Sequence, residues 1–166
     1  MFLDLATLTI VHVLISLAGI GSGLVVLYGL LTGKRMDGWN LTFLTTTVAT
    51  SVTGFFFPFF TLLPSHIFGV ISLVALVVAI LARYPRRLAG PWGPIYAAMA
   101  TLALYLNVFV LVVQLFQKVP AINALAPTQT EIPFAAAQGI VLLAFAAAGY
   151  LAAVRQRPSR RRMQAA

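Results

Sequence analysis

The chain of 166 residues contains no cysteine and only two histidines, and it has three acidic residues against eleven basic ones. The missing cysteine excludes disulfides, thiolate metal sites, Cys-ligated iron–sulfur clusters and cysteine nucleophiles. No acidic residue neighbours either histidine in the sequence, and neither an HExxH motif nor a glycine-rich phosphate loop is present. The chain therefore carries no hydrolytic or nucleotide-binding signature, and we do not expect an enzyme of those kinds.

Charge is scarce throughout the chain, at 8% of residues, whereas 61% are hydrophobic. This composition is too apolar for a soluble domain. A helix needs about 20 mostly apolar residues to cross a hydrocarbon core of about 30 Å, and five segments meet this condition: residues 5–31, 41–60, 66–84, 95–116 and 134–154. They lack the alternation of barrel strands, so each must be a helix. The sequence predicts an all-α integral membrane bundle of five transmembrane helices, with one domain over residues 1–154 and a disordered basic tail over residues 155–166.

The positive charges predict how this bundle is oriented. Ten of the eleven Lys and Arg residues follow the first, third and fifth segments: Lys34, Arg35, Arg83, Arg86, Arg87, Arg155, Arg157, Arg160, Arg161 and Arg162. With five spans these clusters share one side, which the positive-inside rule makes the cytoplasmic side. The N-terminus is then outside and the C-terminus inside. Most tyrosine and tryptophan residues mark the same inner end, as headgroup-level aromatics do: Tyr28, Trp39, Tyr84, Trp92, Tyr96 and Tyr150.

The formal charge of +8 raises the question of a nucleic-acid partner. The basic tail has no interleaved aromatic residues for base stacking, and attraction to anionic lipid accounts for the same charges. We therefore expect the lipid bilayer as partner and no nucleic acid, with other membrane subunits or a homo-oligomer as further partners. The chain resembles small multi-pass membrane proteins of prokaryotes, which implies the cytoplasmic (inner) membrane.

Small and hydroxylated residues predict how the helices pack. The first segment contains the pair Gly19-x-x-x-Gly23, which allows another helix to approach closely. The second carries Thr42, Thr46, Thr50 and Thr53 at helical spacing. Hydroxyls bonded to the preceding helical turn are the simpler interpretation, and a threonine-lined solute path is the alternative.

Polar residues inside apolar spans are costly and tend to mark sites. His12 lies about 10 Å below the outer surface, at 1.5 Å per residue, and His66 opens the third span on the same side. We expect an outer-leaflet pocket formed by five residues: His12, His66, Asn107, Gln114 and Gln138. A site that includes both histidines requires the third span beside the first. The connection over residues 119–133, which contains three prolines, is expected either to cover this pocket or to be a plain interfacial connector.

Several functions are consistent with such a pocket. His12 and His66 can ligate the iron of a haem b between them, or His and Gln can hydrogen-bond the carbonyls of a quinone. Proton or metal-ion handling is a third possibility, since His titrates near physiological pH. A stable metal site would need a third ligand, which Glu131 supplies only if its loop folds inward. In a purely structural role, His12 would bond to Ser16, Gln114, Gln138 or a backbone carbonyl. We expect a protein that binds a redox cofactor, haem b or quinone, or is accessory to one. The alternatives are a structural or assembly subunit of a larger membrane complex, and a component of small-solute or proton transport.

Overall fold

The computed structural model describes residues 4–57 and 64–157, with side chains from residue 67 onward in the second range. In this part the chain is helical and contains no strand. The helices are α1 (Leu5–Thr32), α2 (Asp37–Gly54), α3 (Pro64–Arg83), α4 (Trp92–Lys118), α5 (Pro120–Asn123) and α6 (Ile132–Arg155). Three of them, α1, α4 and α6, are long and apolar enough to cross a membrane.

The helix ends follow local chemistry. Asp4 caps α1 by accepting a hydrogen bond from the Thr7 N–H at 2.7 Å, and Gly33 ends that helix in the left-handed conformation that glycine tolerates. The second helix differs from the expected 41–60, because it begins at Asp37 and ends at Gly54. An acid in the first turn favours the helix N-terminus, and Asp37 also pairs with Arg83 of α3. Residues 58–60 lie outside the described part.

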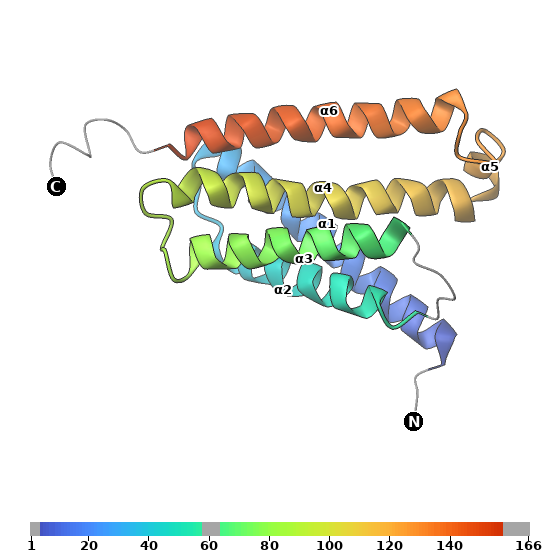
Figure 1. Ribbon diagram of the computed structural model, residues 1–166, viewed down its shortest axis with the longest axis horizontal. Coiled ribbons are helices and arrows are strands. Elements are labelled where there is room, and N and C mark those ends of the chain that lie inside the picture. The colour runs from blue at the N-terminus through green and yellow to red at the C-terminus, as the bar shows by residue number, and fades with distance from the viewer. Residues whose placement is uncertain (1–3, 58–63, 158–166) are drawn as a thin grey trace, which may run out of the picture.

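The long helices alternate in direction along the bundle, with α1 inclined to the nearly parallel α3, α4 and α6, and the short α5 lies at the end where α4 stops (Figure 1). α4 is central and packs on α1, α3 and α6, while α2 packs on both α1 and α3. No packing of α1 directly on α3 occurs among the described residues. A site that includes both histidines requires the first and third spans to be neighbours, and this condition is not met here, because α2 and α4 separate α1 from α3.

The core sits between α1, α2, α3 and α4 and is tightest toward the end where α1 stops. Its largest fully buried side chains are Tyr96, Phe43, Leu76, Leu104 and Thr47. Tyr96 was expected at headgroup level, but it is only 1% exposed and its hydroxyl donates to the Asn40 side chain. A tyrosine side chain can be fully buried when its hydroxyl has a hydrogen-bond acceptor, and Asn40 provides one here.

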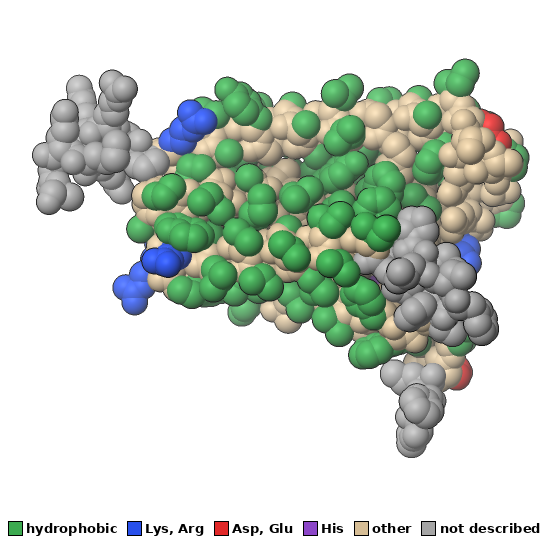
Figure 2. All heavy atoms as spheres, viewed as in Figure 1, with side chains coloured by type: hydrophobic (Ala, Val, Ile, Leu, Met, Phe, Trp, Pro, Cys, Tyr) green, Lys and Arg blue, Asp and Glu red, His purple; other side chains and the backbone are tan. Residues whose placement is uncertain are grey.

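The described charges separate toward the two ends of the bundle, as the blue and red side chains in Figure 2 show. One end carries seven cations and Asp37: Lys34, Arg35, Arg83, Arg86, Arg87, Arg155 and Arg157. Asp4, Lys118 and Glu131 belong to the helix ends at the other side. Arg155 lies within α6 rather than in the expected tail, and its guanidinium donates to the Thr32 carbonyl at 3.0 Å. Residues 158–166 of the tail lie outside the described residues.

Candidate functional site

A small cavity of about 100 Å³ lies among α1, α2, α3 and α4, in the half of the bundle that contains the start of α1. It is partly open rather than enclosed. Its polar lining consists of His12, Thr50, Ser51, Ser72 and Asn107, and its other walls are Gly54, Phe55, Phe68, Gly69, Leu106 and Val110. Four helices thus contribute to one compartment that combines hydrogen-bonding groups with aromatic and aliphatic walls.

His12 is held by Thr53 of α2 and by Phe57, which follows that helix. Its Nδ1 lies 2.8 Å from the Thr53 hydroxyl oxygen, and its ring meets that of Phe57 edge to face at 5.2 Å between centroids. The Thr53 hydroxyl donates its one hydrogen to the Ala49 carbonyl at 2.8 Å, so its oxygen accepts the bond from His12 Nδ1–H. In the neutral ring this hydrogen balance assigns the proton to Nδ1 and leaves Nε2 as an acceptor.

Two further groups retain hydrogen-bonding capacity at the cavity. The buried Ser51 hydroxyl donates to the Ser72 oxygen at 3.1 Å. The hydroxyl hydrogen of Ser72 is therefore not used in this bond. Asn107 donates to the Thr47 hydroxyl oxygen at a long 3.5 Å, a weak bond for an amide with two N–H donors. The cavity can therefore present two donors, Ser72 and Asn107, and one acceptor, His12.

Of the four predicted pocket residues whose side chains the structure describes, it brings His12 and Asn107 together at the cavity. Gln114 is exposed on α4, and Gln138 of α6 lies outside the cavity lining and donates to the Phe109 carbonyl at 3.2 Å. His66 belongs to the first turn of α3, but its side chain lies outside the described residues. A pocket of all five is therefore corrected to a cavity that excludes Gln114 and Gln138, and His12 is bonded to Thr53 rather than to either glutamine.

The connection between α4 and α6 turns toward the end of α4 and not toward the cavity. Asn123 donates to the Phe116 carbonyl at 2.8 Å, and Gln129 donates to the Val113 carbonyl at 3.0 Å. Glu131 accepts hydrogen bonds from both the N–H and the hydroxyl of Thr128, at 3.1 and 2.9 Å. Within the described residues, no three His, Cys, Asp or Glu side chains gather as a metal site would require.

Desolvation raises the pKa of Glu131, but the hydrogen bonds from Thr128, from Thr130 and from its own backbone together outweigh this effect and hold the pKa below its ordinary value. The Glu131 carboxylate is thus hydrogen-bonded within its own turn. It is not the inward-folded third ligand that a histidine metal site would need.

The cavity does not fit a haem. Pockets that enclose drug-sized ligands measure about 300–1,000 Å³, and a porphyrin belongs to that class, whereas this cavity measures about 100 Å³. α2 also lies between α1 and α3, the helices that carry the two histidines. The size suits a single ring with a few oxygen substituents, or a small group of water molecules.

The polar residues that sequence reasoning did not assign to the site carry hydroxyls. Thr50, Ser51 and Ser72 line the cavity, and Thr53 bonds to His12. A usable signal was present, since Thr50 and Thr53 belong to the regular series on α2 and lie near its C-terminal end, at the same depth as His12 near the start of α1. Antiparallel neighbours bring such positions together. Ser72 had no comparable signal, because its contact depends on α2 packing on α3.

Comparisons of the chain with protein-family models, with curated proteins and with solved structures gave no match. Function is therefore argued from the cavity and from the distribution of charge.

Proposed function

We propose that this chain is a multi-pass protein of the prokaryotic cytoplasmic membrane that crosses the bilayer five times, with its N-terminus outside. The apolar helices α1, α4 and α6 support this topology, and so do the alternating helix directions in Figure 1. α2 and α3 have 18 and 20 residues, which give about 27 and 30 Å at 1.5 Å per residue, close to the thickness of the hydrocarbon core. The cationic end then faces the cytoplasm.

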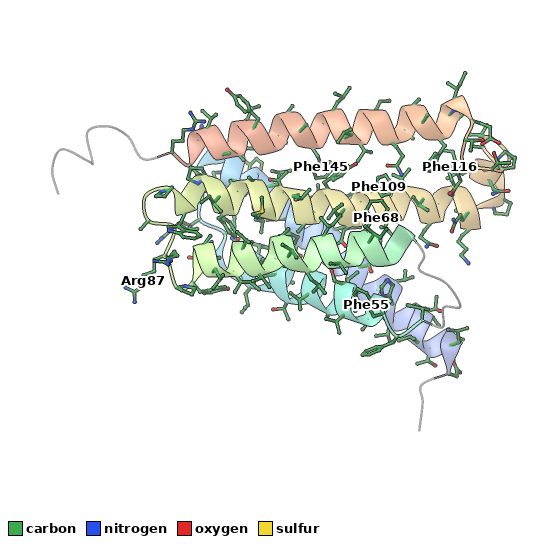
Figure 3. The ribbon with its side chains drawn as sticks, in the orientation of Figure 1. Phe55, Phe68, Arg87, Phe109, Phe116 and Phe145 are labelled. Carbon is green, nitrogen blue, oxygen red and sulfur yellow. The ribbon has the colours of Figure 1, made fainter. Side chains whose placement is uncertain are left out.

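Within this topology, we propose that the cavity binds the ring of a lipid-soluble molecule of the quinone class, and that the protein serves as a quinone-binding or accessory component of a redox system. The observation that carries this proposal is the cavity itself, in which His12, Ser72 and Asn107 share a small compartment with Phe55 and Phe68. The Ser72 and Asn107 donors match quinone carbonyl oxygens, and the His12 acceptor matches a quinol hydroxyl. Phe68 also packs on Phe109 of α4 at 4.7 Å between centroids, and Figure 3 shows the two rings between α3 and α4.

A path for solutes across the whole membrane has less support. Beyond the cavity, the space between the helices is filled by Phe43, Thr47, Leu76 and Leu104, each no more than 1% exposed. Three hydroxyls of α2, those of Thr42, Thr46 and Thr53, donate to carbonyls of the preceding turn. Such side chains strengthen helix packing and do not form an open channel.

Binding of a photoreactive short-chain azidobenzoquinone to the detergent-purified protein tests the proposal. We expect saturable labelling of cavity residues that an unlabelled short-chain benzoquinone competes away. Asn107→Leu should weaken binding about tenfold, since one hydrogen bond contributes about 1 kcal/mol or somewhat more. Gln114→Leu on the same helix is the matched control and should bind like the parent. Unsaturable labelling, or equal loss in both variants, would refute quinone binding.

A second candidate is a structural or assembly subunit of a larger complex, and the surface of α6 favours it. Ala152 is the buried residue of this helix, while Ile140, Leu143 and Tyr150 are 68, 71 and 67% exposed. An apolar face of this kind meets either lipid tails or another subunit. Purification in mild detergent separates the candidates, because defined co-purifying polypeptides without bound quinone favour the assembly role.

A further inference from the structure

A second and larger cavity of about 530 Å³ lies at the cationic end of the bundle, away from the proposed quinone site. It is bounded by the α1–α2 turn, the end of α3 and the first residue after α6. Its charged lining consists of Lys34, Arg35, Asp37, Arg83 and Arg87. Four cations against one carboxylate give this pocket a net charge of +3.

One of the four cations is already neutralised. The Arg83 side chain is 13% exposed, pairs with Asp37, and lies over the Tyr96 ring at 5.4 Å. This ion pair and the Tyr96–Asn40 hydrogen bond fix the side chains at the base of the pocket. The other three cations, Lys34, Arg35 and Arg87, are exposed and form no ion pair with an acid in the described part of the chain. Figure 3 shows Arg87 at this end of the bundle.

The backbone beside the pocket also has an unusual conformation at two residues. Arg87 and Leu88 both have positive φ, at 50° and 58°, a conformation that is strained for residues with a side chain. The Leu88 N–H returns to the Ala82 carbonyl at 2.9 Å, so the turn folds back over the end of α3. Both residues thereby line the pocket.

We propose that this pocket binds a phosphate ester anion, and that the anion is the headgroup phosphodiester of an anionic phospholipid. The uncompensated cations supply the recognition of phosphate. The remaining lining favours a lipid over a free phosphate, because Val26, Leu30, Met36 and Leu88 add apolar surface beside the charges, as the glycerol and upper acyl groups of a lipid require. Basic pockets between transmembrane helices on the cytoplasmic side have this specificity. The assignment to the inner leaflet rests on the proposed topology, whereas phosphate recognition does not.

The test measures binding to the full-length protein in zwitterionic detergent micelles, with thermal unfolding followed by tryptophan fluorescence. The probes are phosphatidylglycerol, phosphatidylcholine and inorganic phosphate, each titrated separately. The pocket variant combines Lys34→Gln and Arg35→Gln. The matched control combines Arg86→Gln and Arg157→Gln, which removes the same charge from the same end of the molecule at residues outside the pocket lining.

Phosphatidylglycerol should raise the unfolding temperature of the parent and of the control, and phosphatidylcholine should not. The pocket variant should need about thirtyfold more phosphatidylglycerol, since each cation near a membrane surface contributes about fivefold. If submillimolar inorganic phosphate stabilises the parent as well as the lipid does, the lipid source is refuted and a soluble phosphate ester takes its place. If the two lipids act alike, or if both double variants lose the response equally, the site is refuted. None of these outcomes depends on quinone binding.

Discussion

At the scale of single residues, the contact between His12 and Thr53 explains how an imidazole is accommodated inside an apolar bundle. A buried ring nitrogen without a partner costs free energy, and no carboxylate lies within reach along the spans. A threonine hydroxyl can serve because it donates to its own helix and still accepts from the ring. His12 therefore links α1 to α2 in the half of the bundle that contains the start of α1.

Removing the Thr53 hydroxyl should reveal the free-energy cost of leaving the His12 imidazole without its hydrogen-bond partner. Thr53→Val keeps the shape but leaves His12 Nδ1–H without its acceptor, so the free energy of unfolding should fall by about 1–3 kcal/mol. Thr45→Val on the exposed side of the same helix is the control and should change it by less than about 0.5 kcal/mol. Adding His12→Leu to Thr53→Val should recover part of the loss, because two apolar partners leave no donor unsatisfied. Unfolding in denaturing detergent measures all three variants. A double variant no better than Thr53→Val would contradict this account.

The residue scale also shows the limit of prediction from sequence. His12 and Asn107 were predicted as site residues, and both line the cavity. Gln114 and Gln138 were assigned to the same site because depth along a helix can be counted from sequence, whereas the lateral order of helices and the rotation of each about its axis cannot. Those two properties place Gln138 against the Phe109 carbonyl and leave Gln114 exposed.

At the scale of helices, the small residues of α1 decide how closely α2 and α4 approach. The predicted role of Gly19 and Gly23 in close packing is confirmed, since both are buried. A Cβ built at Gly23 would lie 2.6 Å from Leu104 Cδ1 and 2.8 Å from Phe43 Cδ2. The boundaries of α4 and α6 were predicted to within three residues, because apolar length and flanking charge determine them. Those of α2 were not, since it begins at Asp37 and ends at Gly54.

Gly23→Ala should therefore destabilise the bundle by about 1–3 kcal/mol, since Leu104 and Phe43 are fully buried and must shift to admit the methyl group. Gly21→Ala is the matched control two residues earlier, where a Cβ meets nothing within 4 Å. Alanine is the better helix former by up to about 1 kcal/mol, so this variant should be neutral or slightly more stable. Unfolding of both variants in the same detergent checks the difference, and equal stability would show that α1 is not packed this closely.

The turn before α6 should respond to acid through Glu131. Its folded-state pKa lies below the ordinary value, so its stabilising bonds are present above the unfolded-state pKa and are lost as the pH falls through the folded-state value. The protection of the Thr128 and Thr130 amides against hydrogen exchange, corrected for intrinsic rates, should fall over that range. In Glu131→Gln it should be low and independent of pH. The Asn123 amide, bonded to the Val119 carbonyl, is the internal control. Unchanged protection of Thr128 at acid pH would contradict this assignment.

At the scale of the whole molecule, the charge distribution and the alternating helix directions both distinguish the cationic end of the bundle from the opposite end. The segregation of cations was predictable because it depends only on the order of apolar and basic segments, and the described helices keep that order (Figure 2). The basic pocket was not predictable. Lys34 and Arg87 come from turns and Arg83 from the last residue of α3, and the packing of α1, α2 and α3 sets how closely they approach. The two cavities lie toward opposite ends of the bundle, with a packed core between them.

The predicted orientation can be tested because the chain has no cysteine to give background labelling. Thr128 is exposed in the connection between α4 and α6, and Gly38 is exposed near the start of α2 with nothing within 4 Å of an added Cβ. In intact cells, Thr128→Cys should react with a membrane-impermeant maleimide, whereas Gly38→Cys should react only after the membrane is permeabilised. The seven described cations around Gly38 make export of that end unfavourable under the positive-inside rule. Labelling of Gly38→Cys in intact cells without labelling of Thr128→Cys would invert the bundle and place the basic pocket in the outer leaflet. Labelling of both from outside would mean that an even number of spans separates them, and would refute the five-span arrangement.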